Sequence, residues 1–281
     1  MQHHKTTTGE KVIFVFLVIL VLLFLAPIFF VVMNSFKGKL FISDNPFAFP
    51  NNVTFSGLDN YIEGVEKTSF FHAFGWSTLI TVLSVIAILL FTSMTAWYIT
   101  RVKNKFTSIL YYMFVFSMIV PFQMVMFTMT KFADMLHLNS PIGMVVLYLG
   151  FGAGLSVFMF SGFVKSIPIE VEEAATVDGC NPIQTFFMIV VPILKPTIIT
   201  VAILNTMWIW NDYLLPYLVI GLSTKYKTIP VVVQYLMGSY GAKDYGSLMA
   251  LLVLAIIPII IFYLFCQKYI IKGVIAGAVK G

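Results

Sequence analysis

Residues 173–192 read Glu-Ala-Ala-Thr-Val-Asp-Gly-Cys-Asn-Pro-Ile-Gln-Thr-Phe-Phe-Met-Ile-Val-Val-Pro, and they form a polar island in a chain otherwise suited to lipid. Hydrophobic residues make up 59% of the 281 positions and charged residues only 10%, and the mean hydropathy is +0.95. A soluble globular domain carries about 25% charged residues, so this composition excludes one. We therefore expect the apolar runs around the island to lie in a membrane and the island to lie outside it.

The apolar runs are long enough to cross a bilayer as helices, which takes about 20 residues each. They predict six spans, near residues 12–34, 75–99, 107–129, 142–164, 197–221 and 246–267. The first run is too long for a signal peptide and lacks a small-residue cleavage site. The sequence thus predicts an all-α integral membrane protein, with residues 1–281 forming a single transmembrane domain.

Basic residues set the expected orientation of these spans. Arg101, Lys103 and Lys105 lie together in a very short loop between the second and third predicted spans, where the positive-inside bias acts most strongly. This places that loop, both chain termini and the polar island in the cytoplasm. Cys180 and Cys266 then lie on the reducing side, so no structural disulfide is expected. The formal net charge of +5 is explained by this topology and needs no nucleic-acid partner.

The polar island, taken as residues 166–195, is predicted to form two short helices that meet at a turn. Pro168 suits the start of the first helix, and Gly179 suits a C-terminal cap with positive φ. Asn181 is expected to cap the second helix, with Gln184 completing a capping box.

Each of these helices has an expected apolar face. On the second helix the face is formed by Ile183, Phe186, Phe187, Val190, Val191 and Leu194, which recur every three or four residues. On the first, Val171, Ala174 and Ala175 form one stripe, while Glu170 and Glu173 form another.

The order of residues in this island resembles the coupling loop of binding-protein-dependent ABC importer permeases. The family pattern is EAA, three residues, G, nine residues and I-x-L-P, and only Val191 departs from it, standing where the family usually has Leu. The resemblance implies that the loop docks in a groove of a separate ATP-hydrolysing subunit. The coupling residues would be Glu173, Ala174, Ala175, Gly179, Ile189 and Pro192, with Glu173 as the polar anchor. The alternative is a hairpin that only packs beneath its own bundle.

Two further stretches are similar to carbohydrate-importer permeases such as the smaller permease of maltose-type systems. They are the run Trp210-Asn211-Asp212 and the tail Gly273-Val274-Ile275-Ala276-Gly277-Ala278-Val279-Lys280-Gly281. The resemblance implies half of a pore for a di- or oligosaccharide. It also implies a second permease, two ATPase subunits that bind ATP and Mg, an extracytoplasmic binding protein and a bacterial cell membrane. No cofactor is expected in this chain itself.

Polar groups in the fifth predicted span are candidates for the translocation path. Asn205, Trp208 and Asp212 lie at i, i+3 and i+7, with Asn211 beside that stripe. Amide and carboxylate groups can bind sugar hydroxyls, and an aromatic face can cover a sugar ring. The alternatives are packing or interfacial aromatics and a solvated Asp212.

Two interruptions inside spans have open interpretations. Gly150-Phe151-Gly152-Ala153-Gly154 favours close helix packing, with a pore kink as the alternative. Pro121 with Gln123 either breaks the third span or is a tolerated kink.

The segment Met237 to Asp244, between the last two predicted spans, also has two interpretations. It either faces the binding protein or is a flexible loop.

Other classes of protein are disfavoured by what the sequence lacks. There is no G-x-x-x-x-G-K-[ST] phosphate loop, so the chain is not expected to hydrolyse ATP itself, as the resemblance to permeases with a separate ATPase implies. No motif for a metal site, a nucleophile or a paired catalytic acid and base is visible, so an enzyme is not expected. A secondary transporter, or an importer for a phosphorylated polyol or another polar solute, is the remaining alternative.

Overall fold

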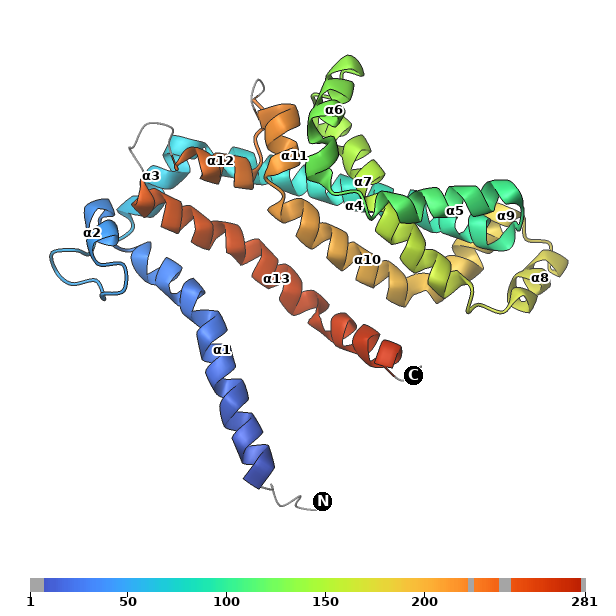
Figure 1. Ribbon diagram of the computed structural model, residues 1–281, viewed down its shortest axis with the longest axis horizontal. Helices are drawn as coiled ribbons and strands as arrows, with labels where there is room; N and C mark the ends of the chain where they lie inside the picture. The colour runs from blue at the N-terminus through green and yellow to red at the C-terminus, as the bar shows by residue number, and fades with distance from the viewer. Residues whose placement is uncertain (1–7, 222–224, 238–243, 279–281) are drawn as a thin grey trace. The chain divides into compact units, whose positions relative to one another are not determined.

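The computed structural model describes residues 8–221, 225–237 and 244–278 and is built from helices and their connections (Figure 1). Within these ranges the extended pairing is limited to an isolated bridge between Lys37 and Phe55. The contacts divide the chain into two compact units. One unit comprises Met1–Phe70 with Val232–Pro258, and the other comprises Phe71–Val231 with Ile259–Gly281.

Among the residues that the structure describes, five helices are long and apolar enough to cross a membrane. They are Thr8–Asn34, Phe70–Arg101, Pro141–Val164, Pro182–Asn211 and Tyr245–Tyr269. The expected all-α membrane class is confirmed. The spans expected at 12–34, 75–99, 142–164 and 246–267 lie within these helices, and the other two expected spans are interrupted.

The span expected at 107–129 is not one straight helix. The structure has α5 (Lys105–Ser117) and α6 (Phe122–Met135), bent by 108° at the break between them. Pro121 is the N-cap of α6, and proline both lacks a backbone N–H and disfavours helical geometry in the residue before it. Pro121 therefore breaks the span, and the chain has six spans if the bent pair is counted as one.

The span expected at 197–221 stops early. Helix α10 (Val191–Asn211) ends before Asp212, whose ψ of 120° is extended, and a short α11 (Leu214–Pro216) and a π-helical turn η2 (Tyr217–Gly221) follow. The backbone N–H of Leu214 donates to Asp212 Oδ1 at 3.0 Å. An aspartate that accepts backbone N–H groups in this way favours a helix boundary over a helix interior.

The start of this helix also differs from expectation. The second arm of the island does not end near residue 195, because α9 (Pro182–Gln184), the π-helical turn η1 (Thr185–Val190) and α10 follow one another without a break. Val191 donates its N–H to Phe186 O, five residues back. This wider register accommodates Pro192, which has no N–H to offer and would crowd the preceding turn.

The first unit contains α1 (Thr8–Asn34), α2 (Lys39–Asp44), α3 (Asp59–Thr68), most of α12 (Ile229–Tyr235) and the start of α13 (Tyr245–Ala278). The buried Asn60 of α3 donates to the carbonyls of Ser35 and Lys37, each at 2.8 Å. A Cβ on Gly64 of α3 would lie 3.2 Å from Leu251 in α13. These contacts hold α3 against both neighbouring segments.

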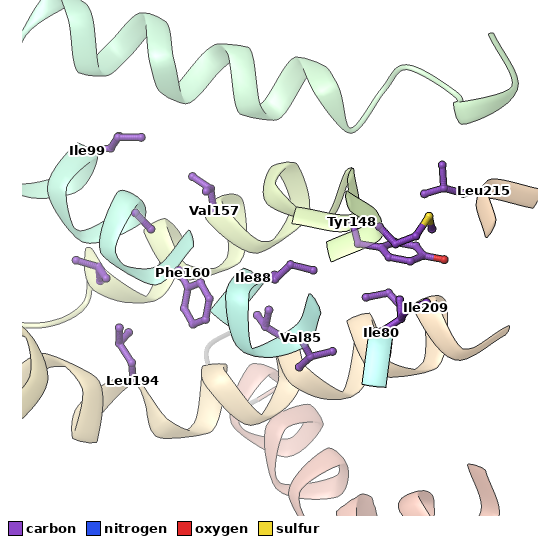
Figure 2. Packing of buried hydrophobic residues seen from close by; sticks show 14 of the residues in the cluster. Ile80, Val85, Ile88, Ile99, Tyr148, Val157, Phe160, Leu194, Ile209 and Leu215 are labelled. Carbon is purple, nitrogen blue, oxygen red and sulfur yellow. The ribbon is translucent and has the colours of Figure 1, made fainter. Parts of the chain in front are cut away.

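The second unit is packed around α7 (Pro141–Val164), between α4 (Phe70–Arg101), α5 and α10. Figure 2 shows the buried side chains that α4, α7 and α10 contribute to this core. A Cβ on Gly152 would lie 2.6 Å from Ile88 of α4 and 2.9 Å from Asn205 of α10, and one on Gly154 would lie 2.8 Å from the carbonyl of Phe114 in α5. The close-packing interpretation is confirmed for these two glycines, and α7 is continuous through them.

Candidate functional site

Residues 166–195, called the hairpin from here on, lie at one end of the second unit. Its first arm, α8 (Ile169–Val177), ends at Gly179, whose φ is +89°. Gly179 donates its N–H to Thr176 O at 3.0 Å, and Cys180 donates to Ala175 O at 2.9 Å. This pair of bonds is a Schellman cap, which requires a left-handed residue at the position of Gly179. The expected cap is confirmed.

The start of the second arm is also as expected. The Gln184 N–H donates to Asn181 Oδ1, and the Asn181 N–H donates to Gln184 Oε1, both at 2.9 Å. This capping box satisfies two backbone donors that would otherwise lack partners at the helix start. Together the two caps fix the turn of the hairpin.

The first arm of the hairpin has an exposed face that we call the docking face, formed by Glu173, Ala174 and Val177. Val177 is 87% exposed, and the carboxylate of Glu173 has no partner among the described residues. Ile183 at the start of the second arm is 66% exposed. The exposed end of the hairpin thus combines an unpartnered carboxylate with exposed apolar side chains.

The three residues of the predicted stripe on the first arm have different surroundings. Val171 is 39% exposed and Ala174 is exposed, whereas Ala175, also predicted as a coupling residue, is buried within the chain. The residue that shares the buried stripe with Ala175 is Glu172, which is only 8% exposed. Helical spacing of three residues brings these two to one side.

The second arm has a narrower buried face than the sequence predicted. Phe186, Val190 and Leu194 are at most 1% exposed, whereas Ile183 and Phe187 are exposed. The buried residues follow a spacing of four, which traces a single stripe along the helix. Among the remaining motif residues, Ile189 is half-buried and Pro192 is exposed.

A polar network at the base of the hairpin was not anticipated. Glu172 Oε1 accepts from Arg101 Nε at 2.9 Å and from Arg101 Nη2 at 2.7 Å, and Glu172 Oε2 accepts from Trp97 Nε1 at 2.9 Å. The signal that could have revealed it is positional. Trp97 and Arg101 lie four residues apart on one side of α4, and Glu172 is on the same stripe as a packing alanine.

At the other end of α10, Asp212 and Trp208 both contact Tyr148. The Tyr148 hydroxyl donates to Asp212 Oδ2 at 3.0 Å, and the Tyr148 and Trp208 rings meet edge to face with centroids 5.5 Å apart. Tyr148 is fully buried (Figure 2), and Trp208 is 42% exposed. Tyr148 was missed, although a tyrosine in an apolar span needs a partner for its hydroxyl.

The other two candidates for the translocation path lie apart from this cluster. Asn205 is 5% exposed and donates to Val201 O at 2.9 Å and to Ser156 Oγ at 3.3 Å. Asn211 is exposed and donates to Met207 O, in its own helix, at 2.7 Å. The structure therefore brings together Trp208 and Asp212, but neither asparagine with them.

No group of three His, Cys, Asp or Glu side chains that could hold a metal occurs among the residues the structure describes. Cys180 and Cys266 are both free thiols. The end of the tail at 279–281 and most of the segment Met237 to Asp244 lie outside the described residues.

Comparison with known proteins identifies the family of this chain. Residues 88–276 match the family described as "Binding-protein-dependent transport system inner membrane component". The chain is 40% identical to the "Probable starch degradation products transport system permease protein AmyC" of Thermoanaerobacterium thermosulfurigenes, over 96% of this chain and 97% of that protein. It is 37% identical to the "Multiple sugar-binding transport system permease protein MsmG" of Streptococcus mutans, over 92% and 93%.

Solved structures show the same fold. The chain superposes with a TM-score of 0.77 and 20% identity on a chain from a bacterial ABC transporter that imports the acidic polysaccharide alginate, covering 94% of this chain and 98% of that one. The family consists of transport subunits, and this chain is accordingly not an enzyme. By its family match and by its near full-length similarity to sequenced permeases, the chain belongs to the binding-protein-dependent ABC importer permeases.

Proposed function

We propose that this permease forms half of the pore of an ATP-driven importer for a di- or oligosaccharide. The relatives' names support the solute class. They specify starch degradation products, multiple sugars and, for a protein of Bacillus subtilis that is 30% identical over 91% of both chains, melibiose, raffinose and stachyose. A phosphorylated polyol is the alternative solute, and a competition assay with both solutes would separate the two.

The hairpin's docking face carries the proposal that ATP hydrolysis drives the permease from outside this chain. Glu173 and Val177 face outward with no covering element among the described residues, and the sequence has no phosphate loop of its own. The partner on this face is one of two ATPase subunits, which bind ATP and Mg. A second permease would complete the pore, and a solute-binding protein would deliver the sugar from the opposite side.

The orientation follows from the same partners. The hairpin and the basic loop 101–105 lie at the same end of the second unit, because Arg101 binds Glu172. The positive-inside bias places this end in the cytoplasm, where ATP is available. The basic residues near the two termini in the sequence favour the same side for both, in the cell membrane of a bacterium.

Trp208 and Asp212 are the proposed sugar-facing residues of this half of the pore. The partly exposed Trp208 ring can cover the C–H face of a sugar. Tyr148 holds Asp212 in position from behind. Closure of the ATPase pair would displace the hairpin and shift the spans between inward-open and outward-open arrangements.

The partner assignment is tested by purifying the chain from its native membrane in mild detergent and identifying co-purifying chains by mass spectrometry. We expect a P-loop ATPase and a second permease. Glu173→Lys should lose the ATPase, while Glu66→Lys, the same charge change on the exposed side of α3, should retain it. A chain that purifies alone in several detergents would contradict the proposal.

A further inference from the structure

The last turns of α4 hold both arms of the hairpin. Trp97 and Arg101, four residues apart, bind the carboxylate of Glu172 in the first arm. Arg101 Nη2 also donates to the Ile167 carbonyl, at the entrance to that arm, at 3.0 Å. The Trp97 ring lies against Phe186 of the second arm, with centroids 5.4 Å apart. The hairpin is thus attached to α4 at three points.

All three side-chain hydrogen bonds that the Glu172 carboxylate accepts from described residues come from α4. One oxygen accepts twice from Arg101, and the other accepts from Trp97. The side chains of Arg101 and Glu172 are only 16% and 10% exposed, so water competes weakly for these bonds. Charge-assisted bonds shielded in this way are stronger and more directional than exposed ion pairs.

Glu172 and Glu173 are neighbours with opposite surroundings. Successive residues of an α-helix point about 100° apart, so one carboxylate turns toward α4 and the other turns outward. Glu172 is 8% exposed and fully bonded, whereas Glu173 is exposed and free to meet another protein. Two adjacent carboxylates therefore have separable tasks, one facing a partner and one facing the permease's own helix.

Helix α4 is suited to carry a displacement away from the hairpin. It has 32 residues and no proline, which gives a rod ~48 Å long, beyond the ~30 Å hydrocarbon core. Near its far end Ser77 Oγ accepts from the Ile229 N–H of α12 at 2.8 Å. Along its middle, Ile80, Val85 and Ile88 pack in the core of the second unit (Figure 2).

We propose that the contact of Glu172 with Arg101 and Trp97, called the joint, transmits displacement of the hairpin to α4. Glu172 is then a positioning residue that couples the hairpin to the spans and does not itself bind the ATPase. This inference rests on the proposed function, since it presumes an ATPase on the docking face. It assigns loss of docking to Glu173 variants and loss of coupling to Glu172 variants. A transporter with a broken joint still hydrolyses ATP but moves little solute for each ATP consumed.

The test uses the whole native complex in proteoliposomes, with maltotriose as the probe solute. Subunit composition, ATP hydrolysis and solute moved per ATP are measured for Glu172→Gln, with Glu170→Gln as the matched control on the exposed side of the same helix. For Glu172→Gln we expect complete complexes, retained ATP hydrolysis and about a five- to tenfold fall in solute per ATP. Glu170→Gln should behave as the unaltered complex.

Milder changes keep the test decisive if Glu172→Gln assembles poorly. Trp97→Phe keeps the ring against Phe186 and removes only the N–H donor, so its loss of solute per ATP should be about two- to threefold. Where Glu172→Gln does assemble, the double variant Glu172→Gln with Arg101→Gln should be no worse than the more impaired single variant, because the two residues act through one joint.

Three results would overturn the inference. They are an unchanged ratio of solute to ATP in Glu172→Gln and Trp97→Phe, losses that add in the double variant, and a transport defect fully explained by missing ATPase subunits. Failure of the proposed function would be recognised separately, because the unaltered chain would then purify without any ATPase.

Discussion

The two ends of the helical run Pro182–Asn211 differ in where their polar groups find partners. At the start, the hairpin binds α4 through Glu172 and leaves Glu173 exposed. At the end, Asp212 is bonded to Tyr148 and to the backbone of Leu214. Glu173 has no partner among the described residues and is available to another protein, whereas Asp212 is held in position by groups of the chain itself. The two ends therefore differ in whether the polar group proposed to meet another molecule is free or already held.

The same distinction divides residues of one type. Asn205 is buried between α7 and α10, whereas Asn211 is exposed and bonded only to its own helix. Trp208 is partly exposed at the end where Asp212 lies. Each contrast can be tested by changing one member and using the other as its control.

The largest effect is expected in the core between the two ends. A side chain at Gly152 would collide with Ile88 and Asn205, whereas a Cβ on Gly150 meets nothing within 4 Å. Gly152→Val should lower the free energy of unfolding by about 3 kcal/mol, because overpacking a filled core forces neighbours out of place. Thermal melting in detergent measures the change. A Gly150→Val variant that is destabilised just as much would contradict this packing account.

The next largest effect is expected from replacing Asn205, compared with replacing Asn211. Asn205→Ala should cost about 2 kcal/mol, because it leaves a small cavity and removes the bond to Ser156. Asn211→Ala should cost less than about 0.5 kcal/mol, as expected for an exposed position. Melting temperatures of the two variants check this order, and equal shifts would show that Asn205 is not a core residue.

Tyr148→Phe tests how Asp212 is held. Removing the hydroxyl deletes the 3.0 Å bond to Asp212 but keeps the ring against Trp208. We expect a stability loss of about 1 kcal/mol, the typical net contribution of one hydrogen bond. We also expect weaker apparent affinity for the sugar in transport assays. Normal stability together with normal transport would show that this hydrogen bond neither stabilises the fold nor positions Asp212.

The turn of the hairpin is sensitive to its glycine. Gly179→Ala places a Cβ on a residue with φ of +89°, which should cost about 1 kcal/mol. The cost falls on the cap and leaves Glu172 and Glu173 chemically unchanged. Circular dichroism melting gives the stability, and Gly75→Ala, in open space within α4, is the control that should not be destabilised.

The smallest effect is the pH dependence of an ion pair in the first unit. Lys67 Nζ lies 2.7 Å from Asp244 Oδ2 and 2.6 Å from Glu63 Oε2. The hydrogen bond to Asp244, with that to Glu63, raises the pKa of Lys67. Burial alone would raise the pKa of Asp244, but its bonds from Lys67 and Ser247 together lower it.

The sign of the pH effect follows from these two shifts. The Asp244 contribution is present above about pH 4 and is lost as the pH falls through its lowered pKa, while the Lys67 contribution is lost as the pH rises through its raised pKa, above about pH 10. Because Lys67 is half-exposed, Lys67→Gln should cost only about 0.5 kcal/mol at neutral pH. Melting at pH 7 and at successively lower pH should show that this difference shrinks as the pH falls through the lowered pKa of Asp244, and Lys39→Gln serves as the exposed-lysine control.

Much of the fold could be predicted from the sequence, because the length of an apolar run and the residues of a helix cap can both be read from neighbouring positions. Gly179 and Asn181 form the caps that their sequence context predicts. The helical run through Pro192 was harder to predict, because the turn before this proline is π-helical and no local sequence pattern indicates that register.

The site was less predictable than the fold. The motif predicts the coupling residues Glu173, Ala174, Ala175, Gly179, Ile189 and Pro192, because the order of its residues is specific. The translocation candidates were chosen by side-chain type and helical spacing. The structure shows that one of them, Asn205, is buried in the core. Glu172 was missed because its partners Trp97 and Arg101 are about 70 residues away in the sequence, and such pairings depend on tertiary packing that no local pattern records.

The central claim is that ATP hydrolysed by a partner on the docking face drives a sugar through this permease. The direct test is uptake of labelled maltotriose into proteoliposomes that contain the purified native complex and its binding protein, with ATP on the hairpin side. The account predicts uptake that requires ATP, that is abolished by Glu173→Lys and that is retained in Glu66→Lys. Uptake that proceeds without ATP, or that Glu173→Lys leaves intact, would contradict it.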